Sequence, residues 1–223
     1  WIVVSCSISF ALIPTKHETV LDILTANPIV TSIIFFNSIN LFVAMCEIIL
    51  GYHIMYIKKD YQDRLKKYGK GKEWDSAFDV LSMPLTLAEV FHGKTWALMW
   101  SAYSLFDPSY QNHESFGFFI DVGNGWSTIP PSLYLNYAIF YPEKVSPVIL
   151  GCVVIASYWQ MLYGTVIYFL SFFFNKRYEG RSNVVSILIF VVIVNGIWFF
   201  FPSVAIYAAY CILRDGNLGI LQV

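Results

Sequence analysis

Three stretches of the chain are apolar and are much longer than a buried strand or a short helix. They cover residues 29–57, 146–173 and 184–213. A helix crosses the hydrocarbon core of a bilayer with about 20 mostly apolar residues, and each stretch exceeds that length. Only helices and closed barrels satisfy the backbone polar groups inside a membrane. The stretches therefore predict an all-α integral membrane protein.

The composition agrees with this class and excludes others. Charged residues make up 13% of the chain and apolar residues 57%. A soluble domain carries about 25% charged residues, so this chain lacks the polar surface of a soluble enzyme. The net charge is −1 and the basic residues form no long stripe, so nucleic acid is not an expected partner. The cysteines lie far apart, and we find no phosphate loop or metal-ligand spacing, so we expect no cofactor and no metal.

Two further segments are weaker candidates for crossing the membrane. Residues 117–141 are more polar, because they contain Asp121, Asn124 and a proline pair. Residues 1–13 are too short to cross alone. We interpret them as the end of a truncated first span, or as an interfacial or signal-like segment. With these two segments we expect about five spans in a single membrane-helix bundle over residues 1–223.

A long polar insert, residues 58–116, separates the second and third expected spans. It opens with a basic run and continues with two semi-apolar stretches, at 76–92 and 95–106. Acidic residues such as Asp79 and Glu89 interrupt the first stretch, so we do not expect it to cross the bilayer. We interpret both stretches as amphipathic helices that lie on the membrane surface or cap the bundle.

Three ionisable residues fall inside expected spans: Glu47, His53 and Asp121. A charged group in a spanning helix costs about 2.5–3.5 kcal/mol on insertion scales, so each is a functional candidate. For Glu47 and Asp121 the alternative is a structural hydrogen bond or an interhelical ion pair. His53 lies near a span end, where its ring can reach the interface. Asn195 is a weaker candidate, since a lone Asn often joins two helices.

Aromatic residues make up 18% of the chain. Trp and Tyr gather at membrane interfaces, which accounts for many of them. It accounts less well for Trp159, Tyr163 and Trp198, which fall well inside expected spans. Aromatic rings around a carboxylic acid suit the protonation of an olefin. The rings stabilise the resulting cation by cation–π attraction, which contributes about 2 kcal/mol when desolvated.

Several segments together resemble the emopamil-binding protein family, the EXPERA domain, which includes the sterol Δ8–Δ7 isomerase and a sigma-type receptor. The segments are WSAYSLFDPSY at 100–110, Asp121, SYWQMLYGTVIYFLSFF at 157–173 and VNGIWFFFPSVAIYAA at 194–209. The resemblance covers about residues 96–210 well and the 29–57 span loosely. It implies a multi-pass protein of the endoplasmic reticulum that binds a sterol or related lipid.

The resemblance also implies roles for particular residues. Asp121 stands where the isomerase has a catalytic glutamate, and Asn195 and Trp198 match its last span. The isomerases also carry a His and a Glu four residues apart in an earlier span. Glu47 matches that Glu, but the position four before it is Val43. This departure counts against Δ8–Δ7 isomerisation itself.

Three functions stay open. The first is a membrane enzyme, an isomerase or cyclase, that protonates an olefin of a sterol or isoprenoid lipid. The second is a non-catalytic protein that binds a sterol or an amphipathic amine. The third is a structural subunit of a larger membrane complex, and a homo-oligomer is also left open. For the enzyme, the expected catalytic residues are Asp121, Glu47 and Asn195, and the expected substrate-binding residues are Trp198, Tyr163, Trp100, Tyr103, Tyr110 and Asn124.

Overall fold

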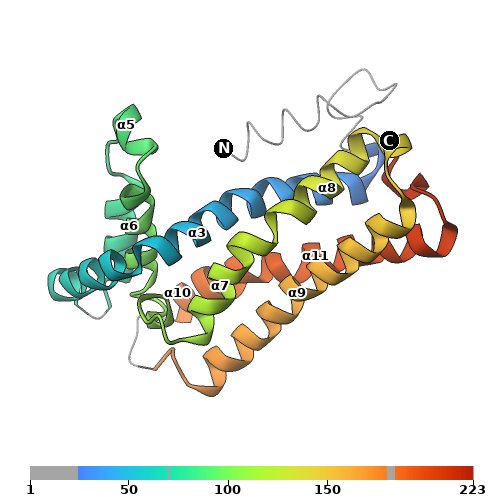
Figure 1. Cartoon of the computed structure of the whole chain (residues 1–223). Coiled ribbons are helices and arrows are strands. Elements are labelled where there is room, and N and C mark those ends of the chain that lie inside the picture. The colour runs from blue at the N-terminus through green and yellow to red at the C-terminus, as the bar shows by residue number, and fades with distance from the viewer. Residues whose placement is uncertain (1–24, 70, 180–183, 223) are drawn as a thin grey trace. The chain divides into compact units, whose positions relative to one another are not determined.

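A computed structural model describes residues 25–69, 71–179 and 184–222 (Figure 1). These residues form helices and no strand, which confirms the all-α class for this part of the chain. The α-helices are α3 (Pro28–Tyr68), α4 (Glu73–Leu81), α5 (Leu87–Val90), α6 (Gly93–Tyr103), α7 (Phe116–Ser127), α8 (Ile129–Phe140), α9 (Pro147–Phe174), α10 (Val184–Ile187) and α11 (Val194–Asp215). The π-helix η3 is Leu188–Ile193, and the 3-10 helices are η1 (Pro108–Gln111), η2 (Pro142–Lys144) and η4 (Gly219–Leu221).

Three helical runs are long and apolar enough to cross a membrane. They are α3 with 41 residues, α9 with 28, and the continuous run of α10, η3 and α11 with 32. All three coincide with the apolar stretches of the sequence. A helix rises about 1.5 Å per residue, so even α9 exceeds the roughly 30 Å of a hydrocarbon core. The described part of the chain thus contains three candidate spans.

The fourth expected span is not one helix. Residues 117–141 form α7 and α8, each of 12 residues, which meet near Thr128. The proline pair of this stretch lies in the first turn of α8, where a missing backbone N–H breaks no intrahelical hydrogen bond. Each helix is about 18 Å long, too short to cross alone. The first expected segment, residues 1–13, lies outside the described residues, so the count of five stays a prediction.

The polar insert contains α4, α5 and α6. The stretch expected over 76–92 is interrupted: α4 ends at Leu81, and α5 begins at Leu87 after a proline. Thr86 and Glu89 form a reciprocal capping box there, in which each side chain bonds the other residue's backbone N–H. The hydrogen bonds from Thr86 lower the pKa of the Glu89 carboxyl. Figure 1 shows that α6 crosses the C-terminal part of α3.

The first residues of the expected insert, 58–68, instead continue helix α3, and polar contacts attach α6 to this end of α3. The Arg64 guanidinium contacts Asp60 at 2.6 Å and the Ser101 hydroxyl of α6 at 3.2 Å. His53, which we expect near the membrane interface, is partly buried. A Cβ added at Gly93, the first residue of α6, would lie 2.7 Å from His53 Nε2. The imidazole therefore packs against the start of α6.

The chain divides into two compact units, each with its own core. Among the described residues, the first unit contains 25–44, 127–164 and 197–222, and the second contains 45–126 and 165–196. Apolar side chains of α3, α8, α9 and α11 form the first core, with Phe36 stacked on Phe201 at 5.8 Å. The second core gathers side chains from α3, α6, α7, α9 and η3, and its buried tyrosines are Tyr110 and Tyr168.

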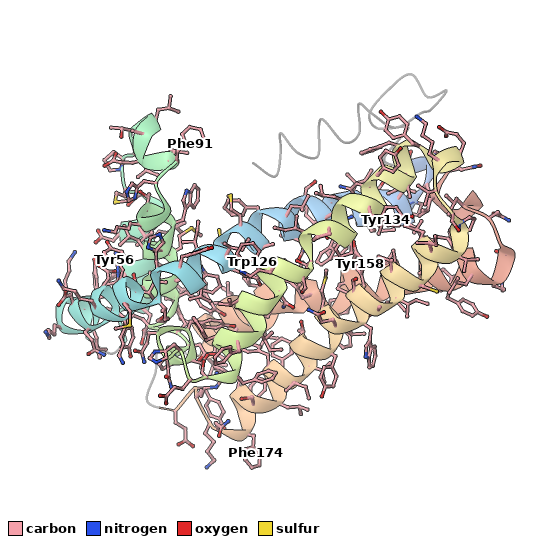
Figure 2. All side chains as sticks on the ribbon, in the orientation of Figure 1. Tyr56, Phe91, Trp126, Tyr134, Tyr158 and Phe174 are labelled. Carbon is pink, nitrogen blue, oxygen red and sulfur yellow. The ribbon has the colours of Figure 1, made fainter. Side chains whose placement is uncertain are left out.

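Buried amides connect the helices of the first unit. Asn37 of α3 donates to Asn136 Oδ1 at 2.7 Å and accepts from the Tyr158 hydroxyl at 2.5 Å (Figure 2 labels Tyr158). Asn40, one turn further on, accepts from Trp198 Nε1 at 2.9 Å. Interhelical hydrogen bonds of this kind fix the register of neighbouring helices in a membrane.

The close approach of α9 and α11 in the first unit gives a direct test of its packing. A Cβ added at Gly151 would lie 2.5 Å from Leu213 Cγ. We expect Gly151→Ala to lower the free energy of unfolding by about 1–3 kcal/mol, because overpacking forces side chains off their rotamers. Adding Leu213→Ala should restore most of the loss in a thermal melt in detergent. Gly123→Ala is the control, since its Cβ would meet nothing within 4 Å. A Gly151→Ala melt equal to that of the control would contradict the contact.

Candidate active site

Two carboxyl groups lie near the same contact between helices in the second unit, Glu47 of α3 and Asp121 of α7. Gly51 lies one turn after Glu47, and a Cβ added there would be 3.1 Å from Val122 Cγ1. The two helix backbones therefore come close at this level, with each acid next to the contact. Glu47 is 5% exposed and Asp121 is partly buried. The Asp121 carboxyl is near enough to act electrostatically on that of Glu47, and such an interaction is stronger in a poorly hydrated site than in water.

Aromatic rings surround the carboxyl pair. The Tyr110 hydroxyl donates a hydrogen bond to the Asp121 carboxyl. The Tyr110 ring centroid lies 5.2 Å from both the Trp100 and Tyr103 rings. Trp100 Nε1 donates to the Cys46 carbonyl at 2.8 Å, next to Glu47 in the sequence. These contacts hold one indole ring and two phenol rings beside the acids.

Asn195 is hydrogen-bonded to Tyr103, one of the rings that surround the carboxyl pair. Its Nδ2 donates to the Tyr103 hydroxyl oxygen at 3.1 Å and to the Val191 carbonyl at 2.8 Å. Tyr103 in turn donates to the Phe190 carbonyl at 3.2 Å. We expected Asn195 to bond the acid or a substrate hydroxyl, whereas in the structure it holds Tyr103 in place. Both carbonyls belong to the π-helix η3, whose wider turn is frequent at functional sites.

Six of the nine expected site residues thus belong to one cluster in the second unit, which we call the carboxyl cluster. Its members are Glu47, Asp121, Trp100, Tyr103, Tyr110 and Asn195. Asn124 lies one turn after Asp121 on α7 and is partly buried.

The two remaining residues belong to the first unit. Trp198 bonds Asn40 there, so its indole N–H has a structural partner. Tyr163 is 53% exposed on α9, and its ring stacks on Trp159 at 6.2 Å. Such an exposed aromatic pair on an apolar helix is typical of a lipid-facing surface.

A buried ion pair in the second unit was not expected from the sequence. Asp107 is 0% exposed, and both oxygens of its carboxylate accept hydrogen bonds. Arg177 Nη1 lies 3.1 and 3.0 Å from its two oxygens, and the Tyr168 hydroxyl donates to Oδ2 at 2.9 Å. The guanidinium also lies over the Tyr168 ring, 5.4 Å from the centroid. The spacing of Asp107 after Trp100 and Tyr103 was the one sequence signal that could have singled out this aspartate. Nothing in the sequence indicated that Arg177 would be its partner.

The residues available to a metal are few. Among the described residues, no three His, Cys, Asp or Glu side chains come together as a metal site would require. The carboxyl cluster contains two acids, two tyrosines, a tryptophan and an amide. This set can donate, accept and share protons and can face a cation with aromatic rings.

The fold and the cluster define a helical protein with membrane-spanning candidates and a largely buried carboxyl pair lined by aromatic rings. Comparison with models of known protein families gives no match, and a search of curated proteins finds no significant relative.

Proposed function

We propose that the chain is a membrane-embedded enzyme that protonates an olefin of a sterol or isoprenoid lipid. The observation that supports this most is the carboxyl pair itself. Two carboxyls at close range with little water share a proton more readily than both ionise, as in other paired-acid sites. One acid then holds the proton to be donated, and its neighbour is ready to accept one.

The proposed step balances without a cofactor. The acid transfers its proton to one olefinic carbon, which leaves a carboxylate and a carbocation on the other carbon. A neighbouring C–H then loses its proton to the second carboxylate, and the electron pair forms a shifted double bond. In a folded polyene, a second olefin attacks the cation first, so a ring closes before the proton leaves. The faces of Trp100, Tyr103 and Tyr110 would stabilise the cation by about 2 kcal/mol or more each when desolvated.

The membrane topology and the cellular location of this enzyme are also part of the proposal. We infer that α7 and α8 cross the bilayer together and that residues 1–13 belong to a further span, which gives five crossings. The insert would lie on the membrane surface, because several of its apolar side chains are exposed. These are Phe78, Leu81, Leu87 and Phe91, the last labelled beside α5 in Figure 2. The resemblance to the EXPERA family supports a place in the endoplasmic reticulum.

A second function is favoured by one observation. Val43 stands where the isomerases carry a His, so part of their proton-handling apparatus is missing. A non-catalytic protein that binds an amphipathic amine would use the same cluster, with Asp121 ionised and the rings around the ammonium group. The structural-subunit alternative instead assigns the exposed insert to a neighbouring protein.

The test is mass spectrometry of lipids that co-purify in mild detergent with the wild type and with Asp121→Asn. The enzyme predicts that both retain a sterol or isoprenoid whose double-bond position or ring count differs between them. Glu114→Gln, a change at an exposed acid, is the control and should match the wild type. The same unaltered lipid in all samples, with weaker retention of cationic amines by Asp121→Asn, would support the binder and overturn the enzyme. If no lipid is retained and trimming the insert removes a protein partner, the subunit replaces both.

A further inference from the structure

We propose that the start of α6 and the neighbouring turn of α3 form a binding site for the headgroup of an anionic phospholipid. The site consists of Lys59 and Lys94 with the apolar side chains of Leu87 and Phe91 beside them, and we call it the headgroup site. It rests on the proposed position of the insert at the membrane surface. It involves no residue of the carboxyl cluster, so it can be tested separately from the proposed chemistry.

A change in the sequence of α3 marks the level of the membrane surface along this helix. The apolar stretch ends at Ile57, and Lys58 and Lys59 follow it directly. A helix that crosses a bilayer places such a change at the boundary between hydrocarbon and headgroups, where lysine side chains extend toward the polar region. Both lysines are exposed. This places them at the depth of the lipid headgroups.

Two contacts place the start of α6 at the same level. The imidazole of His53 packs against Gly93, and Lys94 Nζ lies 5.8 Å from the centroid of the Tyr56 ring. Lys59 follows Tyr56 by three residues in α3, so the two side chains are neighbours on the surface of that helix. The Lys59 and Lys94 side chains are therefore both neighbours of one phenol ring.

The two lysines are not neutralised by nearby acids. Both are exposed, and within the described part of the chain neither forms an ion pair. The acids closest to them in the sequence are bound to other groups: Asp60 to Arg64 and Ser101, Asp63 to Lys66, and Glu89 to Thr86. Exposed lysine side chains are flexible, so one anion from outside the protein can reach both ammonium groups.

The apolar side chains beside the lysines favour a lipid over a free phosphate. Phe91 is 82% exposed and lies two residues before Gly93, which limits the distance between their Cα atoms to about 7 Å. Leu87 is 76% exposed and lies one turn earlier. Side chains this large and this exposed are unfavourable in water and favourable next to acyl chains. A free phosphate would contact the lysines alone, whereas a phospholipid contacts both parts of the site.

Hydrogen–deuterium exchange of the intact protein in nanodiscs tests the headgroup site. The nanodiscs contain phosphatidylcholine alone or mixed with phosphatidylserine, and mass spectrometry follows peptides that cover residues 84–96. We expect exchange in this segment to be about fivefold or more slower with phosphatidylserine, because lysines near an anionic surface favour binding. Lys59→Gln with Lys94→Gln should remove this difference. Leu87→Ser with Phe91→Ser should speed exchange in both membranes.

The matched control is Lys144→Gln with Lys176→Gln. Both of these lysines are exposed, and their replacement changes the net charge by the same amount. Lys144 also lies over a tyrosine ring, that of Tyr141, as Lys94 lies over Tyr56. The control protein should therefore keep the wild-type difference between the two membranes.

The other outcomes overturn the headgroup site in distinguishable ways. A difference that persists in Lys59→Gln with Lys94→Gln, or that is lost in the control, would show that these two lysines do not form it. Slow exchange that depends on the number of protein copies in each nanodisc, and not on the lipid, would assign the surface to a second copy. Equal, slow exchange in both membranes would overturn the site but keep the insert at the membrane surface, whereas equal, fast exchange would overturn both. Turnover is not measured, so each result leaves the proposed chemistry to its own test.

Discussion

Replacing Arg177 with methionine is expected to lower the free energy of unfolding by about 3–5 kcal/mol, because the change leaves the fully buried Asp107 carboxylate without its partner. Methionine keeps the length of the side chain and much of its apolar contact with the Tyr168 ring. The loss therefore reports the unpaired charge rather than a cavity. For a chain of this length it corresponds to a fall of about 6–20 °C in the apparent melting temperature, measured in detergent.

Two further variants show whether the buried charge is the cause. Asp107→Asn added to Arg177→Met should recover most of the loss, since asparagine still accepts from Tyr168 and carries no charge. Lys176→Met, one residue before Arg177, removes an exposed pair with Glu179 and should cost less than about 1 kcal/mol. If the Arg177→Met and Lys176→Met proteins had the same melting temperature, the ion pair would contribute little to the stability of the fold.

The sequence predicted those features that depend on local pattern. The three candidate spans were found because length and low charge alone define a crossing helix. Glu47 and Asp121 were selected because an acid inside a span is costly, and the structure brings both to one contact between α3 and α7. The spacing of Trp100, Tyr103 and Tyr110 was read as a motif, and these three rings do pack on one another.

The features that were missed depend on contacts between distant parts of the chain. Arg177 lies 70 positions after Asp107, at the margin of an apolar stretch, where a basic residue needs no special explanation. The hydrogen bond from Trp198 to Asn40, which is 158 positions away, was likewise not predicted. The interruption between α7 and α8 is a different case. The proline pair that occupies the first turn of α8 was visible in the sequence, but we did not use it to predict a helix start inside residues 117–141.

Glu47→Gln and Asp121→Asn are each expected to lower turnover about 10²- to 10⁴-fold without lowering the melting temperature. The loss of rate follows from the proposed chemistry, because the amides keep the shape of the acids but cannot donate or accept the proton. The melting temperature should stay the same or rise, since the change removes the electrostatic cost of one of two close, poorly hydrated carboxyls. Turnover is measured on the co-purifying lipid in nanodiscs, and stability in a parallel thermal melt.

The double variant distinguishes a shared proton from two separate roles. If the two acids act as one unit, Glu47→Gln combined with Asp121→Asn should lose little more activity than either change alone, as in other catalytic groups whose members work together. Independent roles would instead multiply the two losses. A structural pair would give a third result, in which each amide lowers the melting temperature by several degrees and activity falls only in step with the folded fraction. That result would make the carboxyl pair a part of the helix packing, and the cost of keeping two acids inside the protein would then be offset by the contact between α3 and α7.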